Sequence, residues 1–334
     1  MIKNSFSKEF NLDIPVIMAP MFLVSNEAML NSAIDEGILG VFPSLNYRND
    51  SELASLLARL NAHKEKSSRG NYGVNLIVQK TNVMFEKHLK ICVDHKVSFY
   101  ITSLGSPARV IEEAHKYGGK VYCDVTNLSH AKKCYDLGCD GFIAVGQGAG
   151  GHAGQNPLQV LIPSLKKSFP DKPVIAAGGI ANGSGILSAL ALGASAVSIG
   201  TRFIASTEAN VSEDYKNGIV KAEMDDIVLT EKISGTPCTI INTPYAKKIG
   251  YKQNWIEKLL SNNKRTKKYF KMLVQIRGIN KLMKSVKPGS YETLWCAGKS
   301  VELIDEIKSI KEIVSRLKTE TDSAFKNLNS ELNG

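Results

Sequence analysis

The sequence predicts an α/β fold, a TIM-type (β/α)₈ barrel, and three observations lead to it. Eight short apolar runs are bounded by turn residues, every gap between successive runs holds a helical pattern, and glycine closely follows the last three runs. Near-continuous apolar strands that alternate with helices indicate a parallel sheet buried on both faces. Eight such units within about 200 residues favour a closed barrel over an open doubly wound sheet, which typically has fewer strands.

The expected strands and helices alternate along the chain. The strands are 14–19, 38–42, 72–77, 97–102, 120–125, 141–145, 173–177 and 194–199. The helical patterns between them are 27–36, 51–63, 82–95, 107–117, 128–137, 158–168 and 184–192. Helix-start chemistry supports this assignment, because the stretches Ser25-Asn26-Glu27 and Asn49-Asp50-Ser51 supply N-cap residues and Ser106-Pro107 places proline at a first turn.

The pattern changes after residue 207. We expect 1–207 to form the barrel core and 208–290 to form a mostly helical insertion or lid over the C-terminal mouth, with helical stretches at 212–224 and 253–260. The last part, 291–334, is expected to pack back on the barrel through an amphipathic helix at 301–317. The polar tail 320–334 is expected to be frayed.

Composition restricts the class of protein. The chain of 334 residues contains no run of 18 apolar residues, and its first ten residues lack the apolar segment of a secretion signal. Its six cysteines are scattered without Cys-x-x-Cys spacing, as free thiols in a reducing compartment would be. We therefore expect a soluble, cytoplasmic protein with no metal site and no membrane partner.

The net charge of +10 raises the question of nucleic acid. The basic residues are spread out, concentrate after residue 247, and are not interleaved with aromatic residues, which favours a solvated helical face. We expect no nucleic-acid partner, although salt-sensitive binding to oligonucleotides would support an RNA-associated protein. A positive field would also attract an anionic substrate.

Three glycine-containing junctions carry the chemistry. The run 148–154, Gly-Ala-Gly-Gly-His-Ala-Gly, directly follows the strand 141–145 and sets His152 among glycines. Such glycines let a backbone approach a ligand closely, and a histidine there can hold or release a proton near neutral pH. The alternative is a flexible surface loop with an incidental histidine. The runs 174–180 and 194–203 each place glycine where a strand hands over to a helix, a junction that favours a phosphate group.

The remaining histidines fall within expected amphipathic helices, and we interpret them as surface or structural residues. They are His63, His88, His95, His115 and His130.

Together these motifs resemble the nitronate monooxygenase family, also called 2-nitropropane dioxygenase-like flavoproteins. The similarity extends over nearly the whole chain. It includes Ile-Met-Ala-Pro-Met at 17–21, Tyr-Gly-Val-Asn-Leu at 72–76, Gly-Gly-His-Ala-Gly at 150–154, Ala-Gly-Gly-Ile at 177–180, Ala-Leu-Gly-Ala at 191–194, Gly-Thr-Arg-Phe at 200–203 and Leu-Trp-Cys-Ala-Gly at 294–298. The combination is specific, whereas no single motif is.

The resemblance implies non-covalent FMN at the C-terminal mouth, where barrel active sites lie. The phosphate is expected on the backbone of Gly178, Gly179, Gly200 and Thr201. The isoalloxazine ring is expected against Ala19, Pro20 and Met21.

Three further residues complete the implied cofactor site. Asn75 would hydrogen-bond the polar edge of the flavin, Gly151 would leave room for it, and Asp124 would contact the ribityl hydroxyls. Each role has a structural alternative: Met21 can be core filler, Asn75 a strand-end turn residue and Asp124 an N-cap.

The implied activity is oxidation of alkyl nitronates, and of nitroalkanes, by FMN and O₂ to a carbonyl compound and nitrite. His152 would hold the nitronate oxygens and, for a neutral nitroalkane, abstract the α-proton. Two positions depart from the family. Gln147 lies in a stretch where some members, including enoyl reductases, carry glutamate, and Lys299 stands where many relatives have glutamine.

Other functions stay open at this stage. One is an FMN-dependent NAD(P)H oxidoreductase acting on a quinone or an enoyl thioester, because such barrels bind nicotinamide over the flavin without a separate dinucleotide fold. Another is a flavin-free barrel, such as a sugar-phosphate isomerase or lyase, which uses similar phosphate loops. Homo-oligomerisation is also open.

Overall fold

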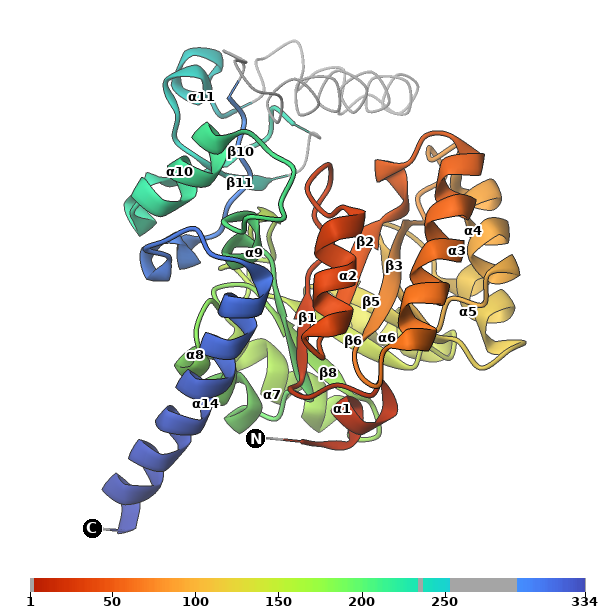
Figure 1. Ribbon diagram of the computed structural model, residues 1–334, viewed down its shortest axis with the longest axis horizontal. Helices are drawn as coiled ribbons and strands as arrows, with labels where there is room; N and C mark the ends of the chain where they lie inside the picture. Colours follow the sequence, from red (N-terminus) through yellow and green to blue (C-terminus); the bar gives the residue numbers. More distant parts are fainter. Residues whose placement is uncertain (1–2, 234–236, 253–292, 334) are drawn as a thin grey trace.

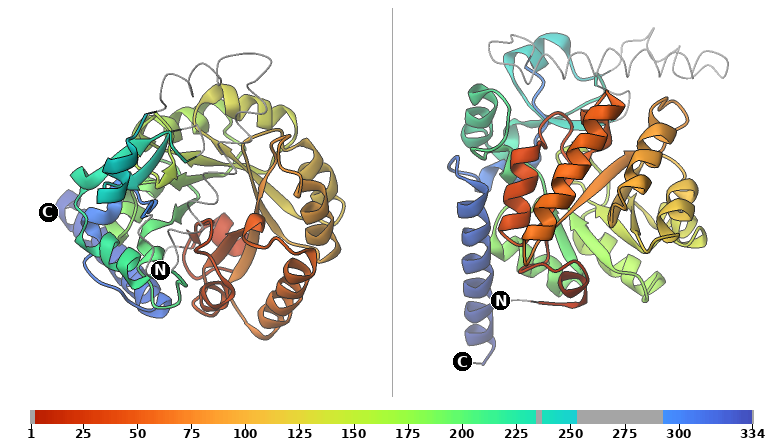
Figure 2. Two further views of the ribbon diagram at one scale, coloured as in Figure 1. Left: turned by 90° about the horizontal axis from the view of Figure 1, so that it is seen from above. Right: turned by 45° about the vertical axis from the view of Figure 1, so that its right-hand side comes forward.

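A computed structural model describes residues 3–233, 237–252 and 293–333 and confirms the barrel. Its eight parallel strands are β1 (Val16–Met18), β2 (Leu39–Pro43), β3 (Asn71–Ile77), β4 (Phe99–Ser103), β5 (Lys120–Val125), β6 (Gly141–Val145), β8 (Val174–Ala177) and β9 (Ala196–Ile199). The ring closes because β9 pairs with β1, with Met18 in register with Ile199. Seen from above, the strands form this ring inside a layer of helices (Figure 2).

The expected helices cover the outside of the barrel. They are α2 (Glu27–Asp35), α3 (Asp50–Lys66), α4 (Phe85–Asp94), α5 (Ala108–His115), α6 (Leu128–Asp136), α7 (Leu158–Ser168) and α8 (Gly183–Ala191). Asn26 and Asn49 cap α2 and α3 through their side chains. Among the helix histidines, His88 is buried against Ser44, while His63 and His115 contact Asp35 and Asp140, contacts that suit structural roles.

A short helix that the sequence analysis missed closes the N-terminal end of the barrel. Helix α1 (Ser5–Glu9) is capped by Asn4, and it lies below the strands in Figure 1. Phe6 and Phe10 pack edge-on against Phe99 and Tyr122 from inside the barrel. The interior is therefore filled at this end, which leaves the opposite, C-terminal end for a ligand.

The insertion contains strands as well as helices. Helix α10 (Glu213–Lys221) lies within the helix expected at 212–224 and is followed by a 3₁₀ turn (Met224–Asp226), β10 (Ile227–Thr230), β11 (Cys238–Ile241) and α11 (Pro244–Ile249). The two strands form a small antiparallel sheet with β7 (Gly151–His152), in the order β10-β11-β7. The helix expected at 253–260 lies outside the described residues. The division at 207 and 290 stays a prediction.

The expectations for the C-terminal helix were wrong at both ends. Helix α14 spans Ile310–Asn333, and a 3₁₀ turn occupies Lys299–Leu303. Ser309 caps the helix by exchanging hydrogen bonds with Glu312, which explains the later start. Glu320 accepts a hydrogen bond from the Gly183 backbone and Thr321 is buried, so α14 packs on α8 up to this point. The tail beyond stays helical to Asn333 and projects past the barrel (Figure 1).

Within the described ranges, no helix is long and apolar enough to span a membrane. All six cysteines are free thiols. The described residues include no group of His, Cys, Asp or Glu side chains arranged to hold a metal ion.

Candidate active site

Glycine backbones from two strand ends touch at the C-terminal mouth. A Cβ atom on Gly148 would lie 3.0 Å from the Cα of Gly179, and one on Gly178 would lie 2.6 Å from the backbone nitrogen of Ala149. Gly178 and Gly179 also have φ of +118° and +76°, a region that side chains disfavour. The loop after β6 and the turn after β8 can therefore meet this closely only because these positions are glycine.

A third segment joins this contact from the C-terminal part of the chain. A Cβ on Gly150 would lie 2.8 Å from the nitrogen of Gly298. The same Gly298 N–H donates to the Thr201 hydroxyl, 3.0 Å away, so the end of β9 is tied to it as well. The structure thus gathers the residues expected to hold phosphate around the loop that carries His152.

The residues expected against a flavin ring lie beside Gly200. A Cβ on Gly200 would be in ordinary contact with Ala19 and Met21, at 3.7 and 3.9 Å. The Met21 backbone is fixed by a hydrogen bond from its N–H to Ser25 and by one from Asn46 to its carbonyl. Ala19 and Pro20 are half-buried and Met21 is 9% exposed, so this segment forms an apolar wall with little freedom.

Polar side chains at the ends of β3, β4 and β5 form a chain of hydrogen bonds. Asn75 donates to the Ser103 hydroxyl (2.8 Å) and to the Ile101 carbonyl (3.2 Å), and Ser103 donates to Asp124 (2.5 Å). Asp124 keeps some accessible surface, but burial of its carboxyl group raises the pKa to about 6, against the opposing effect of the Ser103 hydrogen bond. Ser103 was missed by the sequence analysis, which ended that strand at residue 102.

Asp124→Asn is expected to change how stability depends on pH. Because the folded state raises this pKa from 3.8 to about 6, it binds the proton more tightly than the unfolded chain does. Protonation of Asp124 therefore stabilises the folded state fully below about pH 4, and this stabilisation is lost as the pH rises through 6. Asparagine does not titrate and has no such loss. Between pH 4 and pH 7, the free energy of unfolding of the variant should therefore rise by at most about 3 kcal/mol relative to that of the parent.

Urea unfolding of both proteins at the two pH values measures this difference. Asp136→Asn is the control, because it breaks an exposed pair with Lys132 that contributes less than about 1 kcal/mol. Identical pH profiles for the parent and Asp124→Asn would contradict the raised pKa.

His152 is placed by strand pairing with the insertion. It lies in β7, in register with Cys238 of β11, while Gly151 is in register with Thr239. The imidazole is exposed at the mouth, yet the atoms around it desolvate it enough to lower its pKa. The neutral form, which can accept a proton, is thereby favoured near neutral pH.

Thr239 contacts the backbone of the His152 loop, although it lies 90 residues after Ala149 in the chain. The sequence analysis did not identify Thr239 as a site residue. Its buried hydroxyl lies 2.7 Å from the Ala149 carbonyl and 3.3 Å from the Gly151 carbonyl. A single hydroxyl proton is shared between these two acceptors.

Thr239→Val is expected to lower turnover about tenfold, because it removes these hydrogen bonds next to His152 while keeping the side-chain shape. Thr239→Ser retains the hydroxyl and should recover most of the rate. Steady-state kinetics and the melting temperature of both variants test this. A valine variant as fast as the parent would show that the hydroxyl does not position the loop.

The two positions that depart from the resemblance lie at the surface. Gln147 is exposed and its backbone N–H donates to the Asn156 carbonyl, while Lys299 is exposed in the 3₁₀ turn. Neither side chain is buried among the residues described above.

The comparison with known proteins identifies the family. Residues 46–320 match the family model described as nitronate monooxygenase, which is most of the chain. The chain belongs to the nitronate monooxygenase family. The resemblance seen in the sequence is confirmed, and the protein is an oxidoreductase of this flavin-dependent family.

Relatives of this chain have names that indicate different substrates. A nitronate monooxygenase of Paraburkholderia phytofirmans is 35% identical over 164 residues, 44% of this chain and 43% of that protein. A Mycobacterium tuberculosis protein named (3aS,4S,5R,7aS)-5-hydroxy-7a-methyl-1-oxo-octahydro-1H-indene-4-carboxyl-CoA dehydrogenase is 26% identical over 250 residues, 74% of this chain and 68% of that protein.

Solved structures share the observed fold. FabK from Thermotoga maritima is 29% identical, with a TM-score of 0.84 over 99% of this chain and all of that chain. A nitroalkane oxidase from Streptomyces ansochromogenes is 21% identical and shares the fold, with a TM-score of 0.79 over 96% of this chain and 99% of that one.

Proposed function

We propose that the protein oxidises anionic alkyl nitronates to a carbonyl compound and nitrite, with FMN as cofactor and O₂ as oxidant. The observation that carries this proposal is the backbone contact between the His152 loop, the Gly178–Gly179 turn and Gly298, which sets a titratable group beside a glycine-built cradle. Family membership supports the flavin and the reaction class.

The phosphate end of FMN fits the groups that the cradle leaves available. The Thr201 hydroxyl accepts from Gly298, so its own proton is available to a phosphate oxygen. Gly178, Gly179 and Gly200 carry no side chains of their own, so their backbone groups can approach a phosphate closely. These four residues would hold the phosphate.

The flavin ring fits the apolar wall and the Asn75 amide. Both amide hydrogens of Asn75 are already donated, so its carbonyl oxygen is left to accept from the ring N–H of the flavin. Ala19, Pro20 and Met21 would lie against the ring. Asp124 would accept from the ribityl hydroxyls with the oxygen that Ser103 does not occupy.

Bound FMN would supply the electron acceptor, and the protein would position the substrate. A Cβ at Gly151 would meet no atom within 4 Å, so space for a substrate lies next to His152. The neutral imidazole would abstract the α-proton of a nitroalkane, and it would hydrogen-bond the oxygens of a nitronate, which is already deprotonated.

A second candidate is an FMN-dependent NAD(P)H oxidoreductase that acts on an enoyl thioester or a quinone. The observation in its favour is the relative named as a carboxyl-CoA dehydrogenase, which matches a larger share of this chain than the nitronate monooxygenase of Paraburkholderia does.

Aerobic turnover separates the two candidates. The protein reconstituted with FMN is mixed with ethylnitronate or propionate 3-nitronate, and nitrite is measured; in parallel, NADH and NADPH oxidation is followed with crotonyl-CoA or a quinone. Nitrite release that needs no NAD(P)H supports the proposal. NAD(P)H oxidation that depends on the thioester or quinone, without nitrite release from nitronates, would replace it with the second candidate.

A further inference from the structure

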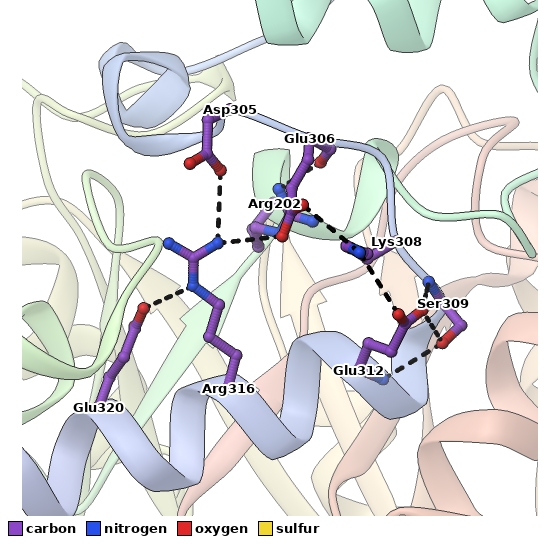
Figure 3. A network of polar contacts seen from close by, with 8 residues as sticks. All are labelled: Arg202, Asp305, Glu306, Lys308, Ser309, Glu312, Arg316 and Glu320. Carbon is purple, nitrogen blue, oxygen red and sulfur yellow. Dashed lines mark hydrogen bonds and ion pairs between the residues drawn. The ribbon is translucent and has the colours of Figure 1, made fainter.

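The short helix that follows the phosphate cradle is fastened to a distant part of the chain. Helix α9 (Thr201–Ile204) begins at the cradle itself, and Arg202 within it is only 6% exposed. The Arg202 guanidinium donates to the Glu306 backbone carbonyl at 2.8 Å, across 104 residues (Figure 3).

The contact of Arg202 is the first of a continuous series. The Lys308 N–H donates to the Ala205 carbonyl, and the Thr207 N–H donates to the Lys308 carbonyl. The Glu208 carboxylate then accepts from the Ile310 N–H at the start of α14. The segments 202–208 and 306–310 thus run side by side. Of the contacts between them, the one made by Arg202 lies nearest to Thr201.

The charge of Arg202 is buried without a carboxylate of its own. Among the described residues, no acidic side chain lies within ion-pair distance of it, because the acids nearby engage other cations. Arg316 binds Asp305, Glu306 and Glu320, while Lys308 binds Glu306 and Glu312 (Figure 3). Desolvation and the nearby Arg316 lower the pKa of Arg202, and the charges of Glu306, Asp305 and Glu320 oppose this only in part.

Burying a guanidinium in this way is costly, which suggests that its position serves more than packing. Thr201 is held from both sides by the C-terminal part of the chain. Its hydroxyl accepts from Gly298, and its neighbour Arg202 is anchored at Glu306. The expected ring contacts have separate supports, since Asn75 is fixed by Ser103 and Met21 by Ser25 and Asn46.

We propose that Arg202 is a positioning residue for the phosphate of FMN, and that it acts by docking α9 on the 298–310 segment. This inference rests on the proposed FMN cofactor. It implies that loss of Arg202 loosens the phosphate end of the site while the ring end keeps its contacts. A general loss of folding would instead affect both ends.

Paired binding measurements with FMN and riboflavin, which lacks the phosphate, test this. Dissociation constants are measured by flavin fluorescence for the deflavinated full chain and for Arg202→Met, Arg202→Lys and Arg316→Gln. The preference of the parent for FMN over riboflavin should fall about tenfold or more in Arg202→Met, the effect of one charge-assisted hydrogen bond. In Arg202→Lys, which keeps one donor and the charge, the preference for FMN should fall less.

Arg316→Gln is the matched control, because it removes an exposed arginine from the same cluster without touching the Glu306 carbonyl. Its preference for FMN should stay within about twofold of the parent, inside the range of a surface ion pair. Circular dichroism checks the fold of each variant. If Arg202→Met does not fold, the FMN and riboflavin affinities of Arg202→Lys alone test the role of Arg202.

The contradicting results are distinct. Equal weakening of FMN and riboflavin, or an unchanged preference, would overturn the role of Arg202 and leave the proposed function standing. A parent protein that binds neither flavin would overturn the proposed function and this inference with it.

Discussion

His152→Asn lowers kcat/KM for a neutral nitroalkane by about a hundred- to ten-thousand-fold and leaves FMN bound. The reason is that asparagine cannot take up the α-proton, a step in which a positioned base contributes a factor of that size. For a nitronate, which has no proton to lose, the same variant loses only the hydrogen bond to the substrate oxygens. That loss is expected to be smaller, about tenfold.

Steady-state kinetics with nitroethane and ethylnitronate measure both numbers. His115→Asn is the control, because His115 pairs with Asp140 at the C-terminal end of α5, away from the mouth. The lowered pKa of His152 adds a pH test: activity on nitroethane should decline only when the pH falls below 6.5 and the imidazole takes up a proton. Unchanged turnover in His152→Asn would remove His152 from the mechanism.

Gly178→Ala is expected to abolish FMN binding and to destabilise the fold by several kcal/mol. The added Cβ would lie 2.6 Å from the Ala149 nitrogen, so the His152 loop must move away from the cradle. The backbone at φ +118° adds a strain of about 1–3 kcal/mol.

Gly138→Ala separates these two effects. Gly138 also has a positive φ, of +84°, but a Cβ there would meet no atom within 4 Å. This variant should lose only about 1–2 kcal/mol in denaturant unfolding and bind FMN as the parent does. Equal FMN affinity in Gly178→Ala and Gly138→Ala would mean that the contact with Ala149 does not shape the cofactor site.

The barrel could be predicted because its signal is local. Each strand is an apolar run, each helix has its own cap or period, and alternation of the two leaves few folds to choose from. The glycine junctions could be predicted for the same reason, because Gly178, Gly179 and Gly200 stand directly at strand ends. The sequence did not show which other segments each glycine junction contacts.

The missed contacts at the site depend on residues far apart in the chain. Thr239 reaches Ala149 across 90 residues, and Arg202 reaches Glu306 across 104. Strand β7 has two residues and exists only because β11 pairs with it, so no periodicity marks it. Asp124 was predicted as a site residue, but its raised pKa comes from burial that only the folded barrel creates.

The most direct test of the central claim is an anaerobic half-reaction. Purified protein is reconstituted with FMN, freed of oxygen and mixed with ethylnitronate while the visible flavin band is recorded. We expect the nitronate to bleach the band without NAD(P)H, air to restore the band, and nitrite to be released. A flavin band that only NAD(P)H bleaches would contradict nitronate oxidation, and a protein that retains no FMN would contradict the cofactor site itself.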